Sequence, residues 1–106
     1  LSVVRILRLE KFFENGKLES RELYNQGILN GLSEKWDSLG VKRESLVYKN
    51  GELEGKARLF DSKGLVKEEM DFFKGMRHGY YRKYQKGVMF QQMRFRLNRC
   101  DSGCTQ

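Results

Sequence analysis

Apolar and polar residues alternate along two stretches of the chain, Val41–Lys49 and Leu65–Phe73. Alternation with a period of two is typical of a β-strand that packs one of its faces. A turn signal precedes each stretch, at residues 37–40 and 61–64, where an aspartate is followed three residues later by a glycine. Aspartate can bond its own backbone, and glycine tolerates a positive φ. Asn50-Gly51 is a second kind of hairpin turn signal.

The spacing of these turns leaves little room for helices, because each glycine in a helix interior costs about 1 kcal/mol. The pattern instead predicts eight strands, at about residues 7–12, 17–25, 31–36, 41–49, 55–60, 65–73, 79–84 and 88–97.

The glycines and aromatic residues reveal an internal repeat. Three glycine series advance in steps of 24 residues, with one final step of 23: Gly16, Gly40, Gly64 and Gly87; Gly27, Gly51 and Gly75; Gly31, Gly55 and Gly79. Two aromatic series keep nearly the same step: Phe12, Trp36, Phe60 and Tyr84; Tyr24, Tyr48, Phe72 and Phe95. The sequence therefore predicts repeats at 13–36, 37–60 and 61–84 and a partial repeat at 85–99, with a half-repeat or cap strand at 1–12 and a tail at 100–106.

Tandem hairpins of this kind predict an all-β fold, an elongated single-layer antiparallel meander, because each hairpin is marginal alone and is stabilised by its neighbours. A register that places all the aromatic residues on one face brings Phe12, Leu18, Trp36, Phe60, Val66, Tyr84 and Met89 into a row, interrupted by Lys42. The same register places Arg58 between Glu44 and Glu68, which favours ion pairing. It also places Glu34 opposite Glu44, which is an unfavourable contact between like charges.

Charge is distributed unevenly along the chain. The 106 residues carry a net charge of +7. The excess lies in one acid-free segment, whose basic residues are Lys74, Arg77, Arg82, Lys83, Lys86, Arg94, Arg96 and Arg99. Such a segment suits nucleic acid, an anionic lipid surface or an acidic partner, and it equally suits a solvated surface. Tyr80 and Tyr81 lie within it and could stack on bases.

The residues that usually carry catalysis or metal binding are sparse. His78 stands where the other repeats have Asn30 and Glu54, beside a turn glycine, and is expected to be an exposed turn residue. Cys100 and Cys104 are expected to be free thiols in a loose tail, because a structural zinc site usually needs four ligands. Two cysteines fit a reducing compartment. We expect no metal site, no cofactor, no small-molecule substrate and no enzymatic activity.

The repeat resembles the MORN repeat family, in particular the variant found in YwqK-type antitoxin-like proteins and in repeat proteins of large DNA viruses. The resemblance covers residues 12–98 and rests on the segment Tyr48-Lys-Asn-Gly51-Glu-Leu-Glu-Gly55, then Phe60 and Gly64. Residues 13–18, 24–31 and 72–79 match it again. The sequence departs from a short aromatic-x-Gly form of the motif, because two residues separate Tyr48 from Gly51. The resemblance implies a non-enzymatic scaffold for protein contacts, and some members of the family have been linked to acidic phospholipids.

The expected function is therefore a repeat scaffold for protein–protein interaction or self-association, such as a structural component of a virus particle. Two alternatives are a toxin-neutralising protein and electrostatic binding of nucleic acid or anionic lipid by the basic residues above. The expected partner-binding residues are Trp36, Phe60, Tyr84, Tyr48 and Phe72. The sequence shows no charged-then-apolar leader, and no apolar run approaches the ~18 residues that span a bilayer. An intracellular or virion location is therefore expected.

Overall fold

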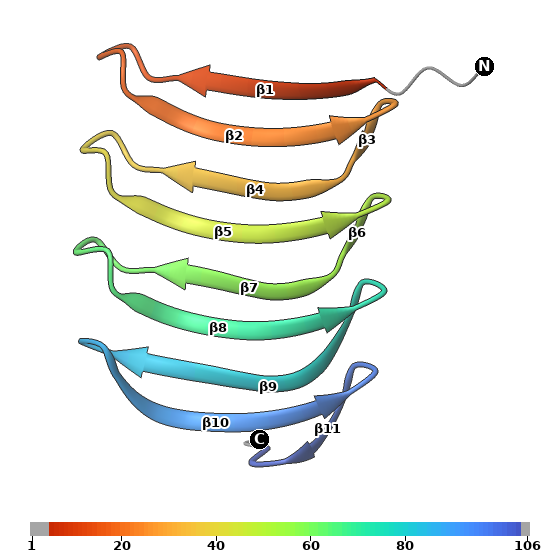
Figure 1. The fold of residues 1–106 in the computed structure, drawn as a ribbon. Helices are drawn as coiled ribbons and strands as arrows, with labels where there is room; N and C mark the ends of the chain where they lie inside the picture. Colours follow the sequence, from red (N-terminus) through yellow and green to blue (C-terminus); the bar gives the residue numbers. More distant parts are fainter. Residues whose placement is uncertain (1–4, 105–106) are drawn as a thin grey trace.

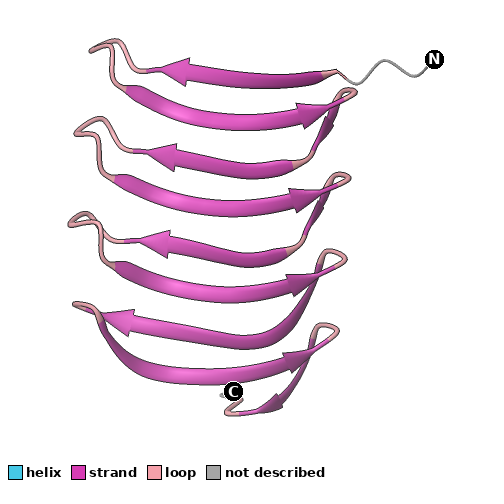
Figure 2. Ribbon diagram, in the orientation of Figure 1, coloured by secondary structure: helices cyan, strands magenta, loops and turns pink. Residues whose placement is uncertain are grey.

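The computed structural model describes residues 5–104 and contains one open antiparallel sheet (Figure 1, Figure 2). Its strands follow one another in chain order, β1-β2-β4-β5-β7-β8-β9-β10-β11, and the short strands β3 and β6 pair with β2 and β5. The strands are β1 (Ile6–Phe12), β2 (Leu18–Asn25), β3 (Ile28–Leu29), β4 (Gly31–Trp36), β5 (Lys42–Lys49), β6 (Glu52–Leu53), β7 (Gly55–Phe60), β8 (Val66–Phe73), β9 (Met76–Gln85), β10 (Val88–Arg96) and β11 (Arg99–Ser102).

The predicted all-β, single-layer meander is confirmed. The eight expected strands are present, and the structure adds the two-residue strands β3 and β6 and the terminal strand β11. The molecule measures 47 × 40 × 17 Å, so it is much thinner than it is wide. Its radius of gyration is 15.9 Å, whereas a compact domain of this length would have about 13 Å. No second layer of described residues covers either face of the sheet.

Aspartate organises the turns at one end of the hairpins. The Oδ1 atom of Asp37 accepts hydrogen bonds from the backbone N–H groups of Leu39 and Val41, both at 3.0 Å. Asp61 accepts the equivalent bonds from Lys63 at 2.9 Å and Leu65 at 3.0 Å. The carboxylate thus satisfies two backbone donors that a turn leaves without a strand partner. The first repeat has Phe13 at this position, and Asn15 bonds the N–H of Lys17 instead.

These bonds predict a specific loss of stability in acid. The backbone N–H of Val41 lowers the pKa of Asp37, and that of Leu65 lowers the pKa of Asp61. A carboxyl whose pKa is lower in the folded chain stabilises the fold above its unfolded pKa of about 3.9, and this contribution disappears as the pH falls through the folded pKa. Thermal melts between about pH 6 and pH 2 should therefore show stability falling below about pH 4.

The double variant Asp37→Asn/Asp61→Asn tests the assignment, because asparagine keeps an acceptor oxygen but does not titrate there. Its stability should fall less steeply than that of the wild type over the same acidic range. If the stability of the two proteins falls equally with decreasing pH, these turns are not the cause of the loss of stability in acid.

The turns at the opposite end of the hairpins place a non-glycine residue and then a glycine at positive φ. Asn50 has φ 50° and Gly51 has φ 84°. Two successive residues with positive φ are characteristic of the type I′ turn, whose twist matches that of the flanking strands. The Oδ1 atom of Asn30 accepts a bond from the N–H of Asn50 at 3.0 Å, and Glu54 accepts one from Lys74 at 2.8 Å. Each of these turns is therefore fixed to the preceding repeat.

The pairing register corrects the predicted rows. Next to the turns, four predicted cross-strand pairs are present: Phe12–Leu18, Trp36–Lys42, Phe60–Val66 and Tyr84–Met89. Beyond each pair the register shifts by one residue, because one residue of the second strand of each hairpin bulges out of the ladder. The unpaired residues are Glu19, Arg43, Lys67 and Phe90.

The shift removes the expected contact between like charges. Glu34 lies opposite Arg21 and Ser45 rather than Glu44. Arg58 lies opposite Ser45 and Glu69 rather than Glu44 and Glu68. The predicted pairing of Arg58 with an acid is retained, but its partner is Glu69, at 2.8 Å.

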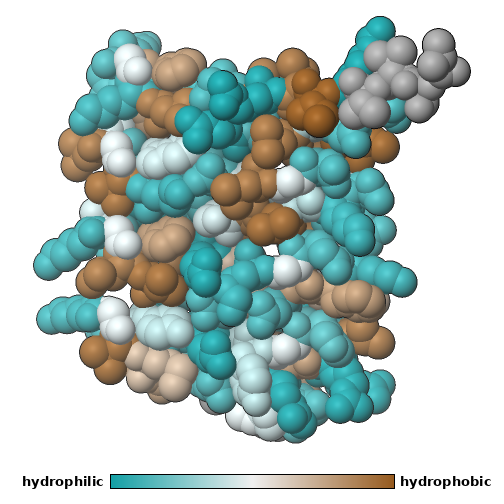
Figure 3. Space-filling model, in the orientation of Figure 1, coloured by the Kyte–Doolittle hydropathy of each residue, from teal (hydrophilic) through white to brown (hydrophobic). Residues whose placement is uncertain are grey.

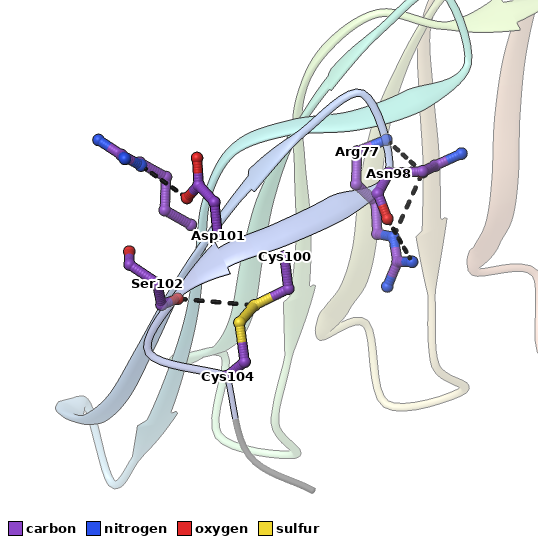
Figure 4. The surroundings of a disulfide bond; sticks show 7 residues. Arg77, Asn98, Cys100, Asp101, Ser102 and Cys104 are labelled. Carbon is purple, nitrogen blue, oxygen red and sulfur yellow. Dashed lines mark hydrogen bonds and ion pairs between the residues drawn. A yellow bond between two sulfur atoms is a disulfide. The ribbon is translucent and has the colours of Figure 1, made fainter.

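The end of the chain also differs from the expectation. Residues 99–102 form β11 on β10, and Cys100 and Cys104 are joined by a disulfide (Figure 4). The prediction of two free thiols is therefore wrong. A Cβ atom at Gly103 would collide with the backbone oxygen of Gln92, so this tail lies directly against β10. Residues 105 and 106 of the predicted tail, and residues 1–4 of the predicted half-repeat, lie outside the described part of the chain.

Candidate functional site

The sheet presents two chemically different faces, because side chains alternate between them along each strand. We call one the hollowed face; its central residues are Ser33, Leu46, Ala57, Met70, Tyr81 and Met93. We call the other the ladder face; its central residues are Glu10, Arg21, Glu34, Ser45, Arg58, Glu69, Arg82 and Gln92. Figure 3 shows one face of the molecule, on which brown apolar groups recur along the left-hand turn edge among teal polar groups.

The hollowed face contains a shallow apolar depression. Its lining residues are Leu46, Leu53, Ala57, Leu59, Glu68, Met70, Phe72 and Tyr81, together with Glu69, whose side chain lies with Arg58 on the ladder face. The depression forms because small residues, Gly55 and Ala57, stand opposite the large side chains of Phe72 and Met70 on β8. Phe95, at the C-terminal end of this face, is the one hydrophobic residue that is buried among those described, with 8% of its surface exposed.

A polar contact lies at the rim of the depression. The hydroxyl of Tyr81 donates a hydrogen bond to Glu68. Burial and this bond raise the pKa of Tyr81 to about 12. The tyrosine therefore stays protonated at neutral pH and acts as a hydrogen-bond donor. A catalytic base or nucleophile would need a lowered pKa, whereas the pKa of Tyr81 is raised.

The ladder face is held together by alternating charges. Glu34 is buried and binds both Arg21, at 3.9 Å, and Lys42. Glu69 binds Lys56, Arg58 and Arg82. Burial raises the pKa of Glu69, but the hydrogen bond from Arg58 and the charge of Lys56 outweigh it and leave the pKa below its usual value. Each of these two carboxylates thus serves as the shared partner of several cations within the sheet.

The aromatic residues expected to bind a partner do not share one face. Side chains two residues apart in a strand lie on the same face. Trp36, Phe60 and Tyr84 therefore lie on the ladder face, two residues beyond Glu34, Arg58 and Arg82. Tyr48 and Phe72 lie on the hollowed face, and Phe72 lines its depression. Trp36 is already engaged, since Arg21 and Lys42 lie over its ring at 5.7 and 5.6 Å from the centroid. All five of these residues are half-buried.

The basic residues do not form one continuous patch. The hollowed face carries Arg77 and Lys83, and the ladder face carries Arg82, Arg94 and Arg96. Lys74 and Lys86 occupy turns at opposite ends of the strands. Arg99 begins β11.

Several of these cations are bound within the fold. Arg77 bonds Asn98 and lies 4.3 Å from the ring centroid of Phe95. Arg82 bonds Glu69 and Gln92. Arg94 bonds Asp101 at 2.8 Å, and this bond lowers the pKa of Asp101. His78 is exposed, as predicted, and its Nδ1 accepts a bond from the N–H of Leu97 at 3.3 Å.

Sequence reasoning missed the residues that shape the hollowed face. Ser33, Ala57 and Tyr81 recur at steps of 24, and so do Leu46 and Met70. These two series are the signal that the sequence offers. Rows aligned on the aromatic residues do not reveal it, because such an alignment takes no account of the bulged residues.

The described residues contain no group of three or more His, Cys, Asp or Glu side chains arranged to hold a metal ion. Within residues 5–104 no helix is long and apolar enough to cross a membrane. No family model, no curated protein and no solved structure matches the chain.

Proposed function

We propose that this protein is a non-enzymatic repeat scaffold whose hollowed face docks a protein partner. The observation that carries the proposal is the single layer of the sheet. Leu46, Leu53, Met70 and Phe72 line a depression that no other described element covers. Apolar side chains gathered on an open face commonly mark a protein interaction site.

The chemistry of the two faces favours the hollowed face as the docking surface. Its centre is apolar, whereas the ladder face carries charges that already bind one another. Docking on the ladder face would desolvate these ion pairs, which is costly unless the partner replaces their solvation. Docking on the hollowed face removes mainly apolar surface from water, which is favourable by about 25 cal/mol per Å².

The proposal includes two biological settings in which such a surface would serve. A structural component of a large assembly, such as a virus particle, would use it to bind a neighbouring protein. A toxin-neutralising protein would use it to bind the toxin. The resemblance to MORN repeats supports both settings equally, because it rests on the repeat and not on a site.

The test is affinity capture from the cells or particles in which the protein is made, with a matched pair of variants. Leu59 on the hollowed face and Leu32 on the ladder face are exposed to similar extents, 36% and 40%. Leu59→Lys should abolish capture of a defined partner, whereas Leu32→Lys should retain it. Equal capture by both variants, or no specific partner for the wild type, would refute the proposal.

One observation favours electrostatic binding as a second candidate. The guanidinium of Arg82 lies 5.0 Å from the ring centroid of Tyr80, and the ammonium of Lys83 lies 5.6 Å from that of Tyr81. Cations beside aromatic rings suit phosphate contact combined with base stacking. Retention on a DNA or heparin resin that disappears at moderate salt would support this candidate, because phosphate contacts are strongly salt-dependent. No retention at low salt would remove it.

A further inference from the structure

The two edges of the sheet are not equally protected. At the C-terminal edge, β11 pairs with β10 through Arg94–Ser102, Phe95–Cys100 and Arg96–Arg99. The tail then continues along β10 as far as Gln92, which Gly103 contacts. At the other edge, the outer side of β1 has no strand partner among the described residues.

The open edge carries exposed apolar residues and charges of both signs. Ile6, Leu7 and Phe12 in β1 expose 73%, 60% and 59% of their surface. Natural edge strands are commonly protected by proline, by charges or by a bulge in the edge strand. The chain has no proline, and the bulge next to β1 lies in β2, at Glu19. The charges of β1 include both signs, Arg8 and Lys11 against Glu10, so they can complement those of a second copy. The edge of β1 is therefore suited to pairing with another strand.

The backbone hydrogen bonds define which residues of β1 face outward. The N–H of Gln26 donates to the carbonyl of Arg5 at 2.8 Å, so Arg5 directs its backbone groups toward β2. Direction alternates along an antiparallel strand. Leu7 and Leu9 therefore also direct their backbone groups toward β2, and Arg8 and Glu10 direct theirs to the open edge.

We propose that β1 pairs antiparallel with β1 of a second copy of this chain, with Leu9 opposite Leu9 at the two-fold axis. In this register Arg8 of each copy lies opposite Glu10 of the other, and Ile6 lies opposite Phe12. Two opposite-charge pairs and two apolar pairs then form together. The outward backbone groups of Arg8 and Glu10 also face each other, as a hydrogen-bonded antiparallel pair requires.

Other registers satisfy fewer of these conditions. Centring the pair on Arg8 or on Glu10 places two like charges directly opposite each other, which is unfavourable. A shift by a single residue places the outward groups of Arg8 opposite Lys11, whose backbone groups point inward, so the hydrogen bonds are lost. Pairing β1 with β10 is blocked where the tail already covers that strand.

The proposed pairing also continues a pattern present in the fold. Glu10 already binds Arg21 of β2 at 3.1 Å and Arg8 of its own strand at 3.7 Å. Arg8 from the second copy would approach the same carboxylate from the open edge, so that arginines of two neighbouring strands flank it, as Arg58 and Arg82 flank Glu69 within one chain. Because the interface is the same surface on both copies, assembly closes at a dimer and does not form a filament. The inference concerns an edge and does not depend on docking at the hollowed face.

The test measures the mass of the 106-residue chain by light scattering and sedimentation over a range of concentrations. The wild type should be in a monomer–dimer equilibrium. Arg8→Glu should raise the dimer dissociation constant at least about tenfold, because both cross-strand ion pairs become repulsive. Glu10→Arg should do the same. An equimolar mixture of the two variants should form a heterodimer, because each altered residue then meets an opposite charge.

Further variants separate the edge from the rest of the molecule. Arg8→Pro removes an outward N–H and leaves the bonds from β1 to β2 intact, so it should give a folded monomer by circular dichroism. Leu59→Lys on the hollowed face should leave the dimer unchanged. The proposal is overturned if the wild type is monomeric up to its solubility limit, or if Arg8→Glu leaves the dimer unchanged. Loss of the dimer in Leu59→Lys instead would also overturn it, by assigning self-association to the hollowed face.

Discussion

Replacing Gly31 with alanine is expected to destabilise the sheet by about 3 kcal/mol, through backbone strain and crowding together. Gly31 has a φ of +118°, a region that residues with a side chain rarely adopt. A Cβ atom there would lie 3.0 Å from Cδ1 and 3.4 Å from Cβ of Leu23, so the leucine would have to move. The loss is large compared with the roughly 5–15 kcal/mol that stabilises an ordinary domain.

The repeat offers a matched control at the same position of the next unit. Gly55 also has a positive φ, +82°, but a Cβ atom there would meet nothing within 4 Å. Gly55→Ala should therefore cost only the backbone strain, about 1 kcal/mol. Urea unfolding of both variants separates the two effects. Equal losses would show that crowding by Leu23 contributes nothing.

Replacing Glu34 with alanine should be the most damaging change on the ladder face, with a loss of about 2–3 kcal/mol. The carboxylate is buried and is the shared partner of Arg21 and Lys42, both of which also lie over Trp36. Its removal leaves two cations close together with one fewer anion between them. Because both cations retain partial contact with water, the loss should lie below that of breaking a fully buried pair.

Glu44 provides the comparison for this prediction. It binds Lys35 at 3.6 Å, and the lysine side chain is 60% exposed. An ion pair of this kind is typically worth less than about 1 kcal/mol. Chemical unfolding should therefore show Glu44→Ala to be only slightly less stable than the wild type. A loss equal to that of Glu34→Ala would indicate that burial of the carboxylate is not what makes Glu34 important.

The strands were predictable because their signals are local. Alternation over Val41–Lys49 and the glycines on either side gave bounds within one residue of β5. β9 was predicted at 79–84 but extends over Met76–Gln85, because in this repeat the short outer strand and the main strand are continuous. The residue type alone did not distinguish a continuous strand from a broken one.

Register was less predictable, because a bulge inserts one residue without changing the length of the repeat. The pair Trp36–Lys42 next to the turn was correct, whereas the rows beyond it were displaced by one residue. Arg43 occupies the bulge, and its Nε donates to the carbonyl of Phe60 at 2.9 Å. A charged residue recurs there as Glu19, Arg43 and Lys67. That regularity was visible in the sequence, but its meaning depends on long-range pairing.

The candidate site was predicted only in part, for the same reason. Tyr48 and Phe72 share a face, as predicted, but Trp36 lies on the opposite face and not with them. A one-residue shift moves a side chain to the other side of a sheet, so an uncertain register leaves the composition of each face undetermined. The disulfide between Cys100 and Cys104 was missed because it depends on how β11 turns back on β10.

The regular stacking of the strands relates the length of the sheet to the number of repeat units. Each unit of 24 residues adds two main strands, as β5 and β7 do, and neighbouring strands in a sheet are about 4.8 Å apart. Insertion or deletion of one whole unit would therefore change the long dimension by about 10 Å while leaving every turn in phase. Chains built from different numbers of this unit would therefore differ in length by multiples of about 10 Å.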